Sequence, residues 1–524
     1  MHKTLQNEDI MRAIFQSIYC CQQRGCPLRD RETVARAARA CKAFCTPALD
    51  TLWKNMDSLV PLVKVLGNSV ARVRVGNTDG DEDDDRDDDR DGVFVYIRRG
   101  QVSSDQWARL CSYAHRIHAI SLHDYQKTVD PSLLAHLVFL AGGQPLFPTL
   151  SMLRFRQLNA AFGREIMAFL SISLKHVEIS VGSLSTARPK VRESNAVRRF
   201  LWGLHATATD LKHFSFSTVV KPPFVDNATS FPKVEYLDLL GCHSSTQMIS
   251  SCANLEQLTE LWVCLRESDN YGVPSCVGFP VLEDLVFSGL PAQIPVFLNL
   301  ISSPSLGAFK YKDRILDRRV LGMPDYLNAF DLIGSKFATT LTCLVMDFPG
   351  FVDDSPVRLM NHIHPLLNIR QLEILELALI VRVELTSDDL HAMATSWTKL
   401  THICIAAYPF VESLPSVCAL ASFGRHCPGL VHMQLPGVET RTPPSLDLQL
   451  PNSHGLNRLC FAGPNYGVEN FDVPVSNPLP VAQFLHGLFP KLSYLSLDSL
   501  GHRWGEVELI YMSLKNGIPL RQLD

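Results

Sequence analysis

One short pattern recurs through most of this 524-residue chain and restricts its fold more than any other feature. An apolar residue is followed by two others, a second apolar residue, one other and a third apolar residue, as in Val234 to Leu239. The spacing of the copies varies from 23 to 37 residues. Fourteen copies begin at Ile117, Leu150, Leu174, Leu211, Val234, Leu258, Leu282, Leu306, Leu341, Leu372, Leu400, Leu430, Leu456 and Leu492.

A single copy cannot bury its own apolar side chains. In an extended backbone the last two apolar residues of the pattern point to the same side, and stacking parallel copies joins these sides into one core. The four starts from Val234 to Leu306 follow at 24-residue steps, which makes chance a poor explanation. We therefore predict an α/β fold, an irregular leucine-rich-repeat solenoid (horseshoe) over residues 93–524. An unrelated leucine-rich α/β fold is the alternative.

The turns depart from the usual repeat, in which Asn or Cys eight residues after the first leucine satisfies backbone groups. Of the fourteen copies, only one has such a residue, Cys242. The uneven spacing predicts loops on one edge of the array. Between strands the sequence is often helical in pattern, as at residues 388–397, where Thr386 is a candidate N-cap.

Residues 1–66 have a different, helical pattern and form the first predicted domain. Asn7 can cap a helix, Asp30 a second, and Pro47 can begin a third. Three helices this short cannot bury all their apolar groups, so the module docks on a partner or covers the end of the solenoid. The pattern leaves both interpretations open.

Three segments of this module resemble an F-box. They are Leu5-x-x-Glu8-x-Ile10-x-x-x-Ile14-Phe15, residues 35–44, and Ala48-Leu49-x-x-Leu52-Trp53. Residues 49–67 and 105–122 are similar to the matching segments of a large fungal group of F-box-like proteins. The chain thus resembles a fungal F-box-like protein with degenerate leucine-rich repeats, an all-α three-helix module preceding the solenoid.

The resemblance implies a substrate-recognition subunit of a cullin-RING (Skp-cullin-F-box) ubiquitin ligase. The F-box would dock on the Skp-type adaptor, and the repeats would hold a protein substrate. Gln6 follows Leu5 where the family has Pro, and the 16–33 spacer is long, which favours the alternative of a repeat scaffold without ligase coupling. The counter-interpretation for the adaptor contacts is that most form the core of the module. The candidate adaptor contacts by position are Leu5, Ile10, Ile14, Phe15, Leu52 and Trp53.

Residues 67–92 are predicted to be a linker with a disordered acidic run. Positions 79–91 hold ten acidic residues and two arginines, so there is nothing apolar to bury and the charges repel. A solvated loop is the simplest interpretation, and a docking segment for a basic partner is the alternative. A calcium loop is excluded, because Asp84 and Arg90 stand where Gly and Glu are needed.

The rest of the sequence excludes several function classes. It contains none of the phosphate-loop, zinc-protease or serine-hydrolase motifs, so we expect no catalytic residue, cofactor or metal. The net charge of -4 does not predict nucleic-acid binding. No apolar run reaches the ~18 residues of a membrane span. Fifteen scattered cysteines and the absence of a signal-peptide pattern predict a cytoplasmic or nuclear protein with reduced thiols. His115, His118 and His123 are predicted to be surface residues.

The repeat register also predicts a binding surface. The residue between the paired apolar positions of each strand should project to the concave side of the array. Trp262 beside Val286 is the best apolar anchor, and the mixed chemistry of the set favours a protein ligand. The candidate partner-binding residues are Arg154, Asp238, Trp262, Val286, Lys310 and Glu376.

Overall fold

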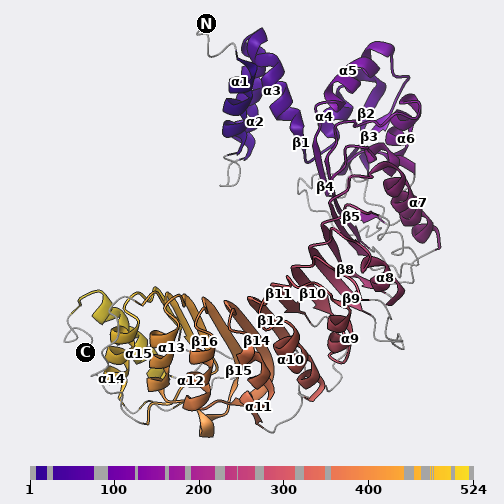
Figure 1. The fold of residues 1–524 in the computed structure, drawn as a ribbon. Helices are drawn as coiled ribbons and strands as arrows, with labels where there is room; N and C mark the ends of the chain where they lie inside the picture. Colours follow the sequence, from indigo (N-terminus) through magenta and orange to yellow (C-terminus); the bar gives the residue numbers. More distant parts are fainter. Residues whose placement is uncertain are drawn as a thin grey trace, which may run out of the picture. The chain divides into compact units, whose positions relative to one another are not determined.

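The computed structural model of the chain describes residues 7–20, 27–75, 93–123, 128–159, 164–182, 191–218, 231–244, 246–265, 277–312, 324–348, 356–441, 454–461, 473, 475, 477–496 and 502–518. The acidic run at 79–91 and Leu5 lie outside the described residues. The chain divides into two compact units, residues 1–243 and 244–524, and each is a set of parallel strands with helices (Figure 1). The predicted 93–524 domain is thus shared between the two units.

The first unit begins with three helices that have a core of their own. They are α1 (Glu8–Cys20), α2 (Pro27–Ala40) and α3 (Lys42–Lys54). Asn7 caps α1, because its side chain accepts hydrogen bonds from the amides of Asp9 (3.0 Å) and Ile10 (3.4 Å). The core consists of Met11, Phe15, Val34 and Ala48, with Ile18, Ala37, Ala38, Phe44 and Leu52 packed against it.

Two helix starts differ from the prediction. Helix α2 begins at Pro27, so Asp30 lies within its first turn and is not the residue before it. Helix α3 begins at Lys42 and contains Pro47, since the earlier start packs Phe44 edge-on against Phe15 with ring centroids 6.0 Å apart. Burial of an aromatic ring outweighs the one helical hydrogen bond that Pro47 cannot donate.

The remaining elements of the first unit form a parallel sheet and one hairpin. The sheet order is β1 (Asn55–Met56), β4 (Ala119–His123), β5 (Met152–Asn159), β6 (His176–Gly182), β7 (His213–Thr218) and β8 (Tyr236–Ser244). Strands β2 (Val70–Val75) and β3 (Val93–Arg98) pair antiparallel, so the predicted 67–92 linker begins with structure. The helices are α4 (Val60–Lys64), η3 (Gly67–Ser69), α5 (Ser104–Ala114), α6 (Pro131–Leu140), η5 (Arg164–Phe169) and α7 (Val191–Thr207).

The second unit repeats one arrangement, a strand followed by a return segment that is often helical. Its parallel strands in order are β9 (Glu260–Leu265), β10 (Asp284–Ser288), β11 (Ala308–Tyr311), β12 (Cys343–Phe348), β14 (Ile374–Glu384), β15 (His402–Pro409), β16 (His432–Leu435), β17 (Arg458–Phe461) and β18 (Tyr494–Ser496), with β13 (Val357–Arg358) paired to β14.

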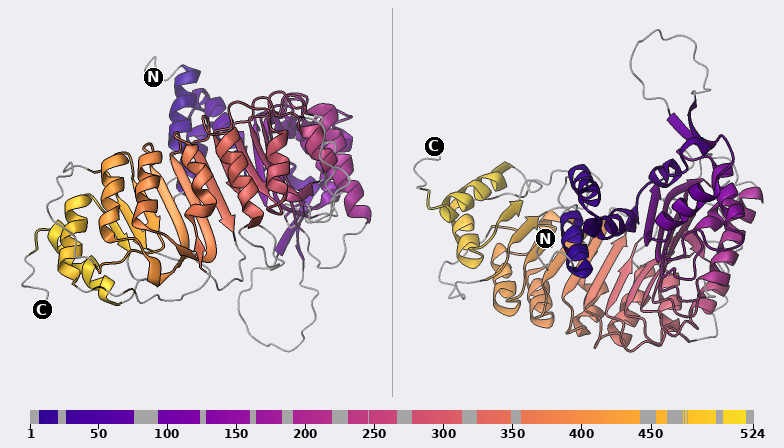
Figure 2. Two further views of the ribbon diagram at one scale, coloured as in Figure 1. Left: turned by 60° about the horizontal axis from the view of Figure 1, so that its bottom comes forward. Right: turned by 90° about the horizontal axis from the view of Figure 1, so that it is seen from above.

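The helices of this unit lie along one face of the strands (Figure 2). They are α8 (Thr246–Cys252), α9 (Gln293–Leu300), α10 (Pro324–Lys336), α11 (Met360–Ile363), η7 (His364–Asn368), α12 (Ser387–Ser396), η8 (Val411–Ser413), η9 (Val417–Ala419), α13 (Leu420–His426), α14 (Pro478–Leu488) and α15 (His502–Lys515). None of the described helices is long and apolar enough to cross a membrane.

The predicted repeats are confirmed at all fourteen starts. Each start lies two residues before a strand, and each of these side chains is 0% exposed. In twelve of the fourteen repeats the next residue donates its amide to the preceding repeat, as Lys175 does to the carbonyl of Ser151 (2.9 Å) and Gly307 to that of Glu283 (2.8 Å). Parallel pairing of one strand per repeat, with helices on one face, is the architecture of a leucine-rich-repeat array.

Two predicted details of the turns are also confirmed. Cys242 is buried, and its thiol donates to the carbonyl of Phe216 at 3.1 Å, which satisfies a backbone group of the neighbouring repeat. Thr386 caps α12 in a capping box, in which its side chain and that of Asp389 each accept from the amide of the other residue. These contacts hold the chain in place at a turn after a strand and at the start of a return helix.

His454, just before β17, makes the stability of the second unit sensitive to acid. Burial lowers its pKa, and the neutral ring donates from Nε2 to the carbonyl of Cys427 (2.9 Å) while Nδ1 accepts from the amide of Leu456 (3.1 Å). Because the folded pKa is below the unfolded value of about 6.5, stability is present above that pH and is lost as pH falls towards the folded pKa.

We therefore expect His454→Gln to lose less unfolding free energy than the unsubstituted chain when pH is lowered from 7.5 to 5. Urea denaturation at both values, followed by circular dichroism, measures this difference. An equal loss in both proteins would show that His454 does not carry the acid sensitivity.

Candidate functional site

The predicted binding residues align in a row on the face of each sheet opposite its helices, here called the open face. In the first unit, strand register places Ser121, Arg154, Glu178, Ser215 and Asp238 side by side. In the second unit it aligns Trp262, Val286, Lys310, Val345, Glu376, Cys404, Gln434, Cys460 and Ser496. Strand register thus aligns the predicted positions within each unit.

Glu178 is the centre of a polar cluster on the open face of the first unit. Arg154 on β5 donates from Nε to Glu178 Oε2 and from Nη2 to Oε1 (2.6 Å). His176, two residues before Glu178 on β6, bonds Oε1 through Nε2 at 2.7 Å. Burial would raise the pKa of Glu178, but the hydrogen bonds from Arg154 and His176 outweigh it and hold that pKa below its ordinary value.

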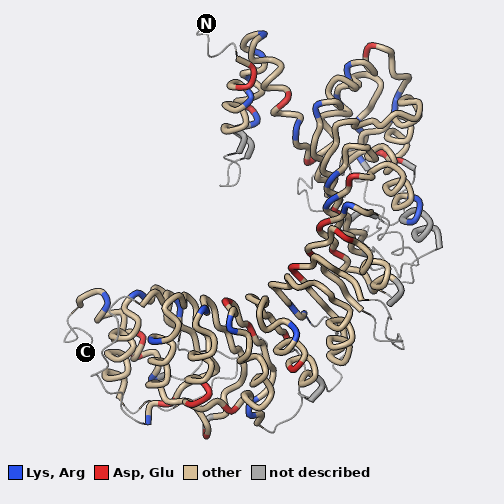
Figure 3. The backbone as a smooth tube through the Cα atoms, in the orientation of Figure 1, with Lys and Arg blue, Asp and Glu red and all other residues tan. Residues whose placement is uncertain are grey.

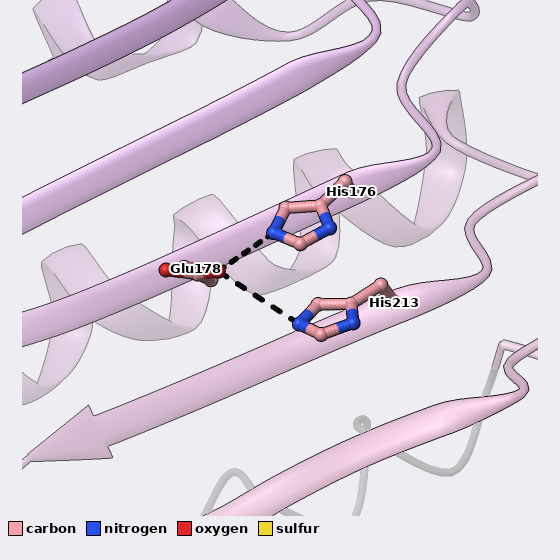
Figure 4. A group of neighbouring side chains, drawn as sticks. All are labelled: His176, Glu178 and His213. Atoms are coloured by element: carbon pink, nitrogen blue, oxygen red, sulfur yellow. Dashed lines mark hydrogen bonds and ion pairs between the residues drawn. The ribbon is translucent and has the colours of Figure 1, made fainter. Parts of the chain in front are cut away.

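A stack of three rings lies beside this cluster. His213 on β7 stacks on His176 with ring centroids 3.8 Å apart, and Tyr236 on β8 stacks on the other side of His213 at 3.8 Å. His213 Nε2 lies 3.9 Å from Glu178 Oε1 (Figure 4). Burial, with the nearby His176, lowers the pKa of His213 to about 4, so its ring is neutral at neutral pH.

The two histidines were missed in the sequence, although a signal for them exists. Successive repeats begin with the same tripeptide, Leu-Lys-His, ending at His176 and His213. Because neighbouring repeats pair in register, equivalent residues must lie side by side on the sheet. Aligning the repeats by the residue two positions after each start would have brought them together.

The other predicted residue of the first unit has contacts within the sheet. Asp238 accepts from the hydroxyl of Ser215 (2.9 Å) and from the amide of Leu240 (3.0 Å). Within β4 to β8 the charged residues are two arginines on β5, one glutamate on β6 and one aspartate on β8 (Figure 3). This part of the open face therefore carries polar side chains of both charges.

In the second unit only one of the two residues predicted to form the apolar anchor, Trp262, is accessible. Trp262 is half-buried and donates from Nε1 to Glu260 (2.9 Å), with Lys312 Nζ 5.7 Å from its ring centroid. Val286 is 1% exposed, so it cannot be a surface anchor. Its register partners on the two neighbouring strands are Trp262 and Lys310.

The polar positions of this row remain accessible. Lys310 is half-buried, with Nζ 3.9 Å from Asp284 Oδ1, and Glu376 is exposed. Cys404 stands next to Glu376 in register, and burial raises the pKa of its thiol to about 12. A thiol that stays protonated is a poor nucleophile, so Cys404 is not suited to covalent chemistry.

Three of the predicted adaptor contacts are engaged within the chain. Phe15 is 4% exposed and belongs to the helical core, and Leu52 packs partly buried against it. Trp53 stacks on Tyr113 of α5, with ring centroids 4.5 Å apart. Phe15 and Leu52 thus belong to the core of the module, as the counter-interpretation expects, whereas Trp53 packs on a helix outside residues 1–66.

Ile10 and Ile14 differ from the other described candidates because they remain on the surface. They lie one turn apart on α1 and are 37% and 40% exposed. Arg12 on the same helix bonds Asp50 of α3, which is also bonded by Arg116. These charged residues line an open pocket of about 320 Å³ with Lys54, His115 and His118.

His115, His118 and His123 are exposed, as predicted.

No protein-family model matches this sequence, and no curated protein matches it. Solved structures that resemble the chain include an internalin from Listeria monocytogenes, with 12% identity over 74% of this chain and 88% of its own, at a TM-score of 0.35. A TDR receptor shares 12% identity over 75% of this chain and 58% of its own, at 0.32. The functional domain of InlJ from Listeria monocytogenes shares 14% over 76% and 65%, at 0.30.

Proposed function

We propose that this chain is a substrate-recognition subunit of a cullin-RING ubiquitin ligase, and not an enzyme itself. The helical module would bind the Skp-type adaptor, and the open face of the repeats would bind the protein to be modified. The observation that carries the proposal is a three-helix module with its own core that exposes Ile10 and Ile14 and precedes an array of leucine-rich repeats.

The exposed pair is suited to the adaptor contact for a physical reason. Two branched aliphatic side chains on one helix face form a small apolar patch, and the buried Phe15 beneath them holds the helix in place. Association removes such a patch from water, and a few buried anchors supply most of the binding energy of an interface. The adaptor contact would thus involve fewer residues than the six candidates that the resemblance implies.

The double substitution Ile10→Asp and Ile14→Asp should lower affinity for the Skp-type adaptor at least about tenfold, because it places charge in the apolar contact. Binding of the purified full chain to the adaptor, measured by surface plasmon resonance, gives this ratio. Ile172→Asp is the matched control, since Ile172 is 71% exposed and lies outside the helical module. Equal affinity of the double variant and the control would refute the assigned contact.

The second candidate function is a repeat scaffold without ligase coupling. Its support is that Phe15, Leu52 and Trp53 make contacts within the chain and are not free for an adaptor. Affinity purification of the full chain from its own cells, followed by mass spectrometry, separates the two functions. A ligase subunit brings down the adaptor together with other proteins, whereas a scaffold brings down partners without it.

A further inference from the structure

We propose that His176, Glu178 and His213 form a binding site for a zinc-like divalent metal ion on the open face of the first unit. They are the three residues, within the described part of the chain, whose ligand atoms all lie within 4.8 Å of one another. The proposal departs from the expectation of no metal, and it does not depend on the proposed ligase function.

The fold itself brings these three ligands together. His176 and Glu178 are two residues apart on β6, so their side chains point to the same face. His213 is the register partner of His176 on β7. In Figure 4 both imidazole rings turn a nitrogen towards the carboxylate of Glu178. Neighbouring strands supply the site with no loop involved, which gives it a rigid frame.

The distances bracket those around a first-row metal ion, and the two stacked rings, 11° from parallel, would have to turn towards each other to share it. The Nε2 atoms of His176 and His213 lie 2.7 and 3.9 Å from Glu178 Oε1. A tetrahedral zinc ion, bound at about 2.0–2.2 Å, separates its ligand atoms by about 3.4 Å, which lies between these values. Two imidazoles and one carboxylate form a donor set typical of zinc sites with an open fourth position.

Arg154 would change its role when the metal binds. Without metal, Oε1 of Glu178 accepts from His176 and from Arg154 Nη2, and a metal ion at Oε1 would replace both hydrogen bonds. Arg154 Nε would keep its hydrogen bond to the other carboxylate oxygen, Oε2. A ligating carboxylate oriented in this way by a hydrogen bond is the usual arrangement around protein metal sites.

The site is accessible from solvent. The side chains of His176, Glu178 and His213 are 22%, 27% and 26% exposed, so an ion can enter and the fourth coordination position faces outward. Tyr236 covers the far side of the His213 ring and restricts its movement. A metal held here would fasten β6 to β7 through their side chains, in addition to the backbone pairing.

The test is a titration of the purified, chelator-stripped full chain with Zn²⁺ by calorimetry. The unsubstituted chain should bind Zn²⁺ at this site, and His176→Ala, His213→Ala and Glu178→Gln should each weaken that binding at least about tenfold. His402→Ala is the matched control, because His402 also faces a histidine, His432, in register, with Ile374 on its other side. Unchanged binding in the three site variants would overturn the proposal.

Two further measurements distinguish binding at this site from binding at cysteines and from misfolding of a variant. The chain has fifteen cysteines, so Co²⁺ is used in parallel, and the site predicts a visible spectrum without the intense thiolate band. In the unsubstituted chain, Zn²⁺ should protect His176 and His213, and not His402, from diethyl pyrocarbonate. This footprint, read by mass spectrometry, needs no variant to fold. A thiolate spectrum, or equal labelling with and without Zn²⁺, would refute the site.

Discussion

Replacing Trp397 by Ala should lower the free energy of unfolding by about 3–5 kcal/mol. Trp397 directly follows helix α12, is 0% exposed, and donates from Nε1 to the carbonyl of Leu366 at 3.1 Å. The substitution removes the large ring from the core, leaves a cavity, and deprives a buried carbonyl of its donor. Urea denaturation of the full chain, followed by circular dichroism, measures the loss.

The control for this prediction is the same substitution at an exposed tryptophan. Trp202 on α7 is 69% exposed, so Trp202→Ala should change the free energy of unfolding by less than about 0.5 kcal/mol. If both variants lost the same amount, burial would not explain the effect at Trp397. If neither did, α12 would not be packed as described.

Gly334→Ala should destabilise the chain by about 1–3 kcal/mol, although alanine usually favours a helix. Gly334 lies near the end of α10, and an added Cβ would meet the carbonyl group of Pro365, with its carbon 2.7 Å away. Because Pro365 belongs to the η7 backbone, it cannot move aside as a flexible side chain would. Denaturation midpoints of the variant and the unsubstituted chain measure the cost.

Gly487 is the matched glycine for this test. It occupies a similar place near the end of α14, and an added Cβ would have nothing within 4 Å. Gly487→Ala should therefore stabilise the chain by up to about 1 kcal/mol. The two substitutions are chemically identical, so opposite signs would attribute the loss at Gly334 to the contact with η7. Equal signs would contradict the close packing of α10 on η7.

The repeat array could be predicted from the sequence because its pattern is set by burial. The first apolar residue of each repeat must enter the core, as Leu258 and Leu282 do, and the strand follows at a fixed distance. Helix starts were less predictable. Pro47 is an ordinary first residue of a helix, and only the packing of Phe44 on Phe15, a contact between distant residues, moved the start of α3.

For the candidate sites, the sequence predicted only what the alternation of residues within one strand determines. The register row followed from alternation within each strand, but alternation does not show that Val286 is buried while its register partners Trp262 and Lys310 are only half-buried. The cluster of His176, Glu178 and His213 required comparison of one repeat with the next. In the helical module, the pattern could not tell Ile14, which faces outward, from Phe15, which faces the core.

The strand register stays the same although the connections between strands differ in length, and this affects how such a chain can evolve. His213 pairs with His176, which is 37 residues earlier, and with Tyr236, which is 23 residues later, yet all three stand in one row. Closing the longer connection costs only about 0.4 kcal/mol more by the logarithmic dependence on loop length. The length of a connection between strands therefore has little effect on the closure cost, whereas a single deletion within a strand shifts its row. Descendants of this protein can change the length of a connection, provided that its buried residues stay in place, and keep the same row of aligned residues.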